Sequence, residues 1–143
     1  MQTGGFKGKS REVPAKELSL QIAKLFAVSP ENVVSEYGMT ELSSQFYDEP
    51  CEGSSSGRAF REPPWARVVP VDEVTLLPVA VGDVGIARIE DFMNIDSTCV
   101  VLTEDRVRRL PGQPNRFELL GRKPGATPRG CSIAIDELLS DHT

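Results

Sequence analysis

The chain has 143 residues, of which 39% are hydrophobic, which is enough for one modest hydrophobic core. Its formal charge is −5, and the sequence contains neither a signal peptide nor an apolar run near the roughly 20 residues of a membrane helix, so we expect a cytoplasmic protein without a membrane span. Three scattered cysteines and a single histidine exclude a disulfide framework, a His-based triad and a His-rich metal site.

The first elements are a helix and a short strand. Apolar residues at Leu18, Ile22, Leu25 and Phe26 follow helical spacing, and Pro14 suits a first helical turn, so the pattern predicts a helix over 14–27. The run 32–36 predicts a buried strand that ends at the Tyr-Gly pair of residues 37–38. A strand that runs into a glycine-containing loop is a frequent location for ligand binding.

The rest of the chain divides into a loop and a β-rich region. Residues 48–64 are rich in Gly, Ser, Pro and charge, which predicts a mobile surface loop. Short β-branched or alternating runs then predict antiparallel strands at 65–71, 84–90, 98–103 and 116–121, and residues 132–139 indicate a strand-like start followed by helical turns. We therefore expect one compact α+β unit with a helix and strand segment (1–47), the loop (48–64) and an antiparallel β subdomain (65–143).

Charge is unevenly distributed along the sequence. Residues 104–130 contain seven basic and three acidic residues, a net +4, so the remainder carries −9. Such a region can meet an anionic ligand such as a nucleotide or coenzyme, and the alternative is a solvated surface of mixed charge. No feature of the chain predicts nucleic-acid binding.

Residues 37–41, Tyr-Gly-Met-Thr-Glu, hold the parts that an ATP site needs. The ring of Tyr37 can stack on adenine, Gly38 permits close approach of the backbone, Thr40 can bond a phosphate oxygen and Glu41 can hold Mg²⁺. The alternative is an ordinary turn with Tyr37 in the core and Glu41 in solvent.

This motif resembles the YGxTE motif of the adenylate-forming superfamily, which includes acyl-CoA synthetases, aryl-CoA synthetases and luciferases. Met39 occupies the variable position. Further similar segments follow in the same order, namely VGDVGIARI (82–89, with Val81), LTED (102–105) and LLGRKPGATPRG (119–130). The resemblance implies the C-terminal part of the family's N-terminal domain, with a small α/β layer beside a distorted antiparallel β-barrel.

The resemblance also assigns roles to two charged residues. Asp105 takes the place of the aspartate that bonds the ribose hydroxyls, although Glu104 replaces the usual glycine before it. Arg122, in a Gly-Arg pair, corresponds to an arginine near ribose and phosphate, where a guanidinium fork bonds oxygen pairs well. We expect Tyr37, Asp105 and Arg122 to converge with Thr40 and Glu41 on one open groove. A surface ion pair between Asp105 and Arg122 is the alternative.

Within the superfamily the chain most resembles acyl-protein synthetases of the LuxE type, through TGGFKG (3–8), the segment 94–105 and RGCS (129–132). That family has a cysteine near the C-terminus that accepts the acyl group, and Cys131 matches it. The other thiols are expected to be unsuitable, since Cys51 falls in the Gly/Ser-rich loop without fixed surroundings and Cys99 in an apolar strand, where burial would raise its pKa.

The resemblance implies a C-terminal fragment of an ATP-dependent ligase that converts a fatty or other carboxylic acid to acyl-AMP and passes the acyl group to its own cysteine. ATP and Mg²⁺ would be the cofactors, and an acyl-reductase protein a possible partner. The superfamily's hinge aspartate, lid lysine and phosphate loop have no counterpart in the sequence, so we expect the isolated chain to be inactive. The alternatives are a fragment of a phenylacetate-CoA ligase-like enzyme, with coenzyme A as acceptor, and a non-catalytic binding domain of the same fold.

Overall fold

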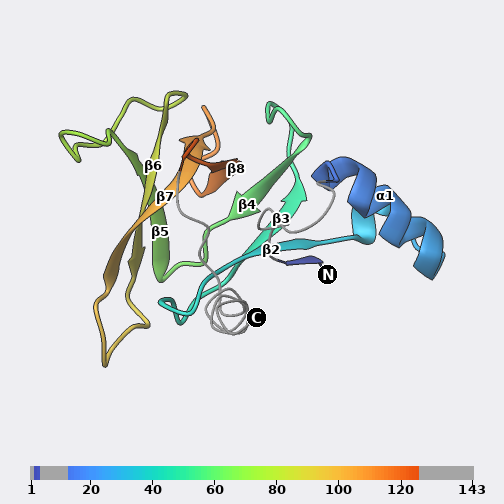
Figure 1. The fold of residues 1–143 in the computed structure, drawn as a ribbon, viewed down its shortest axis with the longest axis horizontal. Helices are drawn as coiled ribbons and strands as arrows, with labels where there is room; N and C mark the ends of the chain where they lie inside the picture. The colour runs from blue at the N-terminus through green and yellow to red at the C-terminus, as the bar shows by residue number, and fades with distance from the viewer. Residues whose placement is uncertain (1, 4–12, 126–143) are drawn as a thin grey trace, which may run out of the picture.

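The computed structural model describes residues 2–3 and 13–125. In chain order its elements are β1 (Gln2–Thr3), α1 (Ala15–Phe26), the 3-10 helix η1 (Pro30–Asn32), β2 (Ser35–Tyr37), β3 (Phe46–Pro50), β4 (Arg58–Arg61), β5 (Ala66–Val71), β6 (Val84–Asp91), β7 (Val100–Arg109) and β8 (Arg116–Arg122) (Figure 1). The strands form one eight-stranded sheet in the order β1-β2-β3-β4-β8-β7-β6-β5. Within it β1 pairs parallel with β2 and the other neighbours pair antiparallel, so the predicted α+β class is confirmed.

The sheet is open and does not close into the distorted antiparallel β-barrel that we expected. Strand β5 forms one edge, and side chains and a loop occupy its outward backbone groups. The Val68 amide donates to Glu62 at 2.7 Å, and the Val68 carbonyl accepts from Arg109 at 3.1 Å. Pro70 has no amide hydrogen, and its carbonyl accepts from the Val79 amide at 3.1 Å. Because these groups already have partners, β5 does not need a further strand to satisfy them.

The core lies inside the curve of this sheet. An aromatic cluster comes from strands at different places in the chain, with the Phe117 ring centroid 5.4 Å from that of Phe46 and 5.6 Å from that of Phe60. Tyr37 joins the cluster, and aliphatic residues such as Val68 complete it. Figure 1 shows the strands β2, β3 and β4 on one side and β5, β6 and β7 on the other, and the cluster joins these two halves.

The predicted first helix is confirmed, and the strand after it lies further along. Helix α1 spans Ala15–Phe26 and ends at Ala27, whose left-handed backbone (φ 52°) caps it. The predicted strand at 32–36 is observed as β2 at Ser35–Tyr37, because Pro30 starts the 3-10 turn η1 in front of it. Leu25 and Phe26, on the predicted apolar face of α1, are exposed.

The expectation of a mobile loop at 48–64 is wrong in part. Strand β3 extends to Pro50, β4 occupies Arg58–Arg61, and the two strands pair with four register partners. The charged residues that suggested a loop form an ion pair between these two strands, with Arg58 Nε 2.7 Å from the carboxylate of Asp48. Only the segment 51–57 connects the two strands.

The later strands agree better with prediction. The expected strands at 65–71, 84–90 and 116–121 are observed as β5, β6 and β8. The strand predicted at 98–103 is longer and starts later, at Val100–Arg109, and Val107 in its second half is buried. The predicted element at 132–139 lies outside the described residues. None of the helices in the described part of the chain has the length and apolarity needed to cross a membrane.

Candidate functional site

Three of the predicted site residues meet at the junction of β2, β7 and β8. The hydroxyl of Tyr37, the last residue of β2, donates to Asp105 Oδ2 at 2.8 Å. Asp105 and Arg122 are register partners on β7 and β8, with Arg122 Nε 3.7 Å from Asp105 Oδ1. Arg122 also bonds Glu104 at 3.0 Å, so both acidic residues of the LTED segment hold one guanidinium.

The ring of Tyr37 belongs to the core. Its centroid lies 6.0 Å from Phe46, 6.0 Å from Phe60 and 6.1 Å from Phe117, and the residue is 8% exposed. The surroundings of Tyr37 therefore match the alternative interpretation, in which this tyrosine is a core residue. The ring that was expected to stack on adenine is packed among phenylalanines. Burial, and then the charge and hydrogen bond of Asp105, raise the pKa of Tyr37 above its ordinary value, so the hydroxyl stays a donor.

The remaining motif residues lie in an exposed turn after β2. Thr40 Oγ1 donates to Glu41 Oε2 at 3.1 Å, and the Leu42 amide donates to the Met39 carbonyl at 3.1 Å. Gly38, Thr40 and Glu41 are exposed, whereas Met39 packs against the core. Among the described contacts, none joins Thr40 or Glu41 to Asp105 or Arg122. The structure thus brings together one half of the predicted site and leaves the other half in a separate turn.

Glu41 is the residue expected to hold Mg²⁺. Within residues 2–3 and 13–125, no group of three or more His, Cys, Asp and Glu side chains gathers in a way that could hold a metal ion. Glu41 is therefore a single exposed carboxylate, whose oxygen accepts the Thr40 hydroxyl.

Two buried polar residues, which sequence reasoning missed, fix the segment after the motif. Asn94 donates to the Glu41 carbonyl at 2.8 Å and accepts from the Ser43 amide at 2.8 Å. Asp91, fully buried at the end of β6, accepts from both the amide and the hydroxyl of Ser44 at 2.8 Å. Burial opposes ionisation of Asp91, but hydrogen bonds from Ser44 and from backbone amides outweigh it and lower its pKa.

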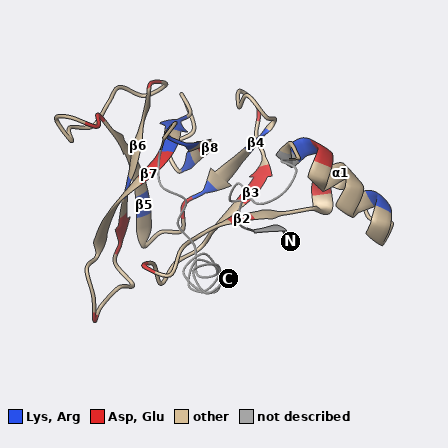
Figure 2. Ribbon diagram, in the orientation of Figure 1, with Lys and Arg blue, Asp and Glu red and all other residues tan. Residues whose placement is uncertain are grey.

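The basic segment is largely neutralised by ion pairs. Its paired cations and their partners are Arg108 with Glu118, Arg109 with Glu62, Arg116 with Glu49, Arg122 with Glu104 and Lys123 with Glu73. Figure 2 shows basic and acidic stretches on neighbouring strands. This arrangement is a surface of mixed charge, on which an anionic ligand at Arg122 would compete with the carboxylate of Glu104.

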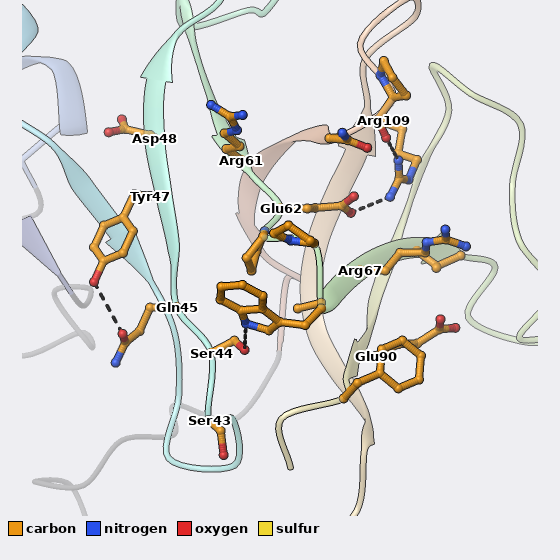
Figure 3. A pocket seen from close by; sticks show the side chains of 18 of the residues that line it. Ser43, Ser44, Gln45, Tyr47, Asp48, Arg61, Glu62, Arg67, Glu90 and Arg109 are labelled. Atoms are coloured by element: carbon orange, nitrogen blue, oxygen red, sulfur yellow. Dashed lines mark hydrogen bonds and ion pairs between the residues drawn. The ribbon is translucent and has the colours of Figure 1, made fainter. Parts of the chain in front are cut away.

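A large groove lies elsewhere in the described residues. A groove of about 1110 Å³ opens between β3–β4 and β5–β6, and none of the predicted site residues lines it (Figure 3). We call it the β3–β5 groove. The sequence feature that could have indicated this groove is Trp65, the only tryptophan of the chain, which directly follows Pro63 and Pro64.

The surroundings of the cysteines are the reverse of the prediction. Cys51 is buried against Ala59 and Leu110, whereas Cys99 is exposed just before β7. The strand predicted around Cys99 begins only at Val100, which leaves the thiol outside it. Cys131 lies outside the described residues.

Comparison with known proteins adds no family to these observations. A scan of protein-family models and a search of curated proteins both gave no match to the chain.

Proposed function

We propose that the chain is the C-terminal, nucleotide-binding part of an ATP-dependent acyl-protein synthetase. The observation that carries the proposal is the contact between Tyr37, Asp105 and Arg122. The first two of these residues are 68 positions apart, and sequence motifs independently assign them to one nucleotide. Residues that share a ligand must lie together, whereas unrelated motif matches have no reason to meet.

The chemistry would proceed in two steps. A carboxylate oxygen of the fatty acid attacks the α-phosphorus of ATP, which forms acyl-AMP and releases pyrophosphate. The thiolate of Cys131 then attacks the acyl carbonyl, the acyl–phosphate bond breaks, and AMP leaves with its electron pair. In this scheme Asp105 accepts hydrogen bonds from the ribose hydroxyls, Arg122 bonds phosphate oxygens and Glu41 would hold Mg²⁺. An acyl-reductase that receives the acyl group fits the same proposal.

Nucleotide binding tests the proposal directly. We expect AMP to shift the amide resonances of β7 and β8 in an NMR titration of the chain. Asp105→Asn should raise the dissociation constant of AMP at least about tenfold, because it removes the charged carboxylate that accepts hydrogen bonds from the ribose hydroxyls. Asp83→Asn, at an exposed aspartate outside this junction, is the matched control and should bind like wild type. Equal binding by wild type and Asp105→Asn would contradict the proposal.

A second candidate is a non-catalytic binding domain, which the burial of the Tyr37 ring favours. The two functions differ at Glu41. In the synthetase, Glu41→Gln weakens binding of ATP with Mg²⁺ more than binding of AMP alone, because the carboxylate is assigned to the metal. In a binding domain without catalysis the substitution leaves both affinities unchanged. A titration of each nucleotide with and without Mg²⁺ separates the two.

A further inference from the structure

The β3–β5 groove is a site that neither the predicted motifs nor the proposed function uses. Its walls come from β3–β4 on one side and β5–β6 on the other, and Pro63 and Pro64 connect β4 to β5 along it. Its volume of about 1110 Å³ exceeds the range of about 300–1,000 Å³ that is usual for small-molecule pockets. An open, two-walled groove of this size suits a segment of extended polymer.

Two aromatic rings stand exposed on one wall. The Phe92 amide donates to the Trp65 carbonyl at 3.0 Å, which continues the β5–β6 ladder beyond the register pair Ala66 and Asp91. Those two residues are buried, so the alternation of strand side chains turns Trp65 and Phe92 to the outer face. Trp65 is 48% exposed and Phe92 65% exposed.

The tryptophan ring is also fixed in place. Trp65 Nε1 donates to Ser44 Oγ at 3.1 Å, and the same hydroxyl donates to the buried Asp91. A held but exposed aromatic ring loses little conformational entropy when a partner covers it. Trp65 is therefore suited to act as an anchor for an apolar side chain.

The charge of the groove is positive once its ion pairs are counted. Every carboxylate that lines it has an arginine partner, namely Asp48 with Arg58, Glu49 with Arg116, Glu62 with Arg109 and Glu90 with Arg88. Two further arginines, Arg61 and Arg67, lie on opposite sides of Glu62 (Figure 3).

These two arginines are available to a ligand. Arg67 is the register partner of Glu90, but the Glu90 carboxylate lies 3.0 Å from Arg88, and Arg67 forms no ion pair within the described residues. Arg61 is exposed and reaches Glu49 only at 3.8 Å, and Arg116 already holds that carboxylate at 2.5 Å.

We propose that the β3–β5 groove binds an extended acidic peptide segment of a partner protein. Carboxylates of the peptide pair with Arg61 and Arg67, and apolar side chains between them cover Trp65 and Phe92. A polynucleotide fits less well, because the chain has a net charge of −5 and repels a long polyanion, whereas a short peptide brings few charges. This proposal is independent of the proposed nucleotide site.

Trp65 reports binding directly, since it is the only tryptophan. The probe is an unlabelled peptide of about ten residues in which Asp alternates with Leu, long enough to span roughly 33 Å when extended. We expect a saturable change in tryptophan fluorescence that weakens severalfold between about 50 and 500 mM salt. The same peptide with Lys for Asp should give no saturable change, and a thymidine oligonucleotide of similar length should bind more weakly.

Substitutions identify the groove as the binding site. The double variant Arg61→Gln/Arg67→Gln should weaken binding of the Asp-Leu peptide at least about tenfold. Phe92→Ala, checked for folding by circular dichroism, should weaken it at least about threefold. Arg106→Gln is the matched control, because Arg106 is an exposed arginine of β7 outside the groove, and it should bind within about twofold of wild type.

Four outcomes would overturn the proposal. The first is that the Asp-Leu peptide gives no saturable signal in either fluorescence or calorimetry, and the second is that the Lys-Leu peptide binds equally well. The third is that the oligonucleotide binds more tightly than the Asp-Leu peptide. The fourth is that Arg106→Gln loses as much affinity for the Asp-Leu peptide as the double variant does.

Discussion

Replacing Tyr37 with phenylalanine separates the two roles of this residue. The substitution keeps the ring among the phenylalanines and removes the hydroxyl that donates to Asp105 at 2.8 Å. A hydrogen bond to a charged acceptor contributes roughly 1.5–3 kcal/mol. The Asp105 side chain is 17% exposed and has Arg122 at 3.7 Å, so water and the guanidinium replace part of the lost bond. We therefore expect Tyr37→Phe to lower the free energy of unfolding by about 1–2 kcal/mol near neutral pH.

The same variant should respond differently to alkaline pH. Burial and Asp105 raise the pKa of Tyr37 in the folded protein, whereas a tyrosine of the unfolded chain ionises near pH 10. This difference in pKa contributes fully to the free energy of unfolding below about pH 10. The contribution decreases as pH rises above about 10, because the Tyr37 hydroxyl then loses its proton in the unfolded state but not in the folded state. At about pH 11 the loss is about 1.4 kcal/mol. Tyr37→Phe has no proton to lose, so its deficit relative to wild type should nearly vanish.

The measurement is urea unfolding followed by Trp65 fluorescence at about pH 8 and about pH 11. Tyr47→Phe is the matched control, since Tyr47 is the only other tyrosine, is exposed, and bonds Gln45 at 3.4 Å. Lysines and cysteines titrate in all three proteins, so their effects cancel in the differences. An unchanged gap between wild type and Tyr37→Phe at the two pH values would refute the reasoning, because Tyr37 would then ionise as readily folded as unfolded.

Three further predictions concern the parts of the fold that hold the site. Asp91→Asn should cost about 1–3 kcal/mol at neutral pH in urea unfolding. That cost should shrink below about pH 4, because a lowered pKa gives stability that is present above the unfolded value and lost as pH falls. Gly85→Ala should destabilise by about 3 kcal/mol or more in thermal unfolding, since a Cβ there would lie 2.6 Å from the backbone nitrogen and oxygen of Val71. In a Cys131→Ser background, a thiol reagent should modify the native protein faster at Cys99 than at Cys51, so Cys99→Ser should remove the fast reaction while Cys51→Ser retains it.

Hydrophobic periodicity predicted the elements whose apolar residues repeat regularly. Helix α1 and strands β5, β6 and β8 were found in this way. Strands β3 and β4 were missed because Asp48 and Arg58, which look like loop residues in the sequence, form an ion pair between the two strands. The polar pattern of a strand pair carries information only when its partner is known, and the sequence does not identify the partner.

The site shows the same division. Motif order predicted that Tyr37, Thr40, Glu41, Asp105 and Arg122 belong together. Asp105 contacts both Tyr37 and Arg122, whereas Thr40 and Glu41 lie in a separate turn. It did not predict that the Tyr37 ring is buried, because this depends on Phe60 and Phe117, which β4 and β8 bring to it. Burial arises from tertiary packing, so a motif can predict which residues lie close together without predicting which side-chain faces are accessible.

The two halves of the sheet meet without closing into a barrel, and their polar contacts explain how. A closed barrel satisfies the backbone of its last strand by pairing it with the first. In this protein Glu62 and Arg109 bond the outer edge of β5, while Asp91 and Asn94 hold the segment that leads from the Tyr-Gly-Met-Thr-Glu turn into β3. Side chains thus provide the hydrogen bonds that strand pairing would provide, and the walls stay apart. The space left between them is the β3–β5 groove, and Glu62 and Arg109, which bond the open edge of β5, also line this groove.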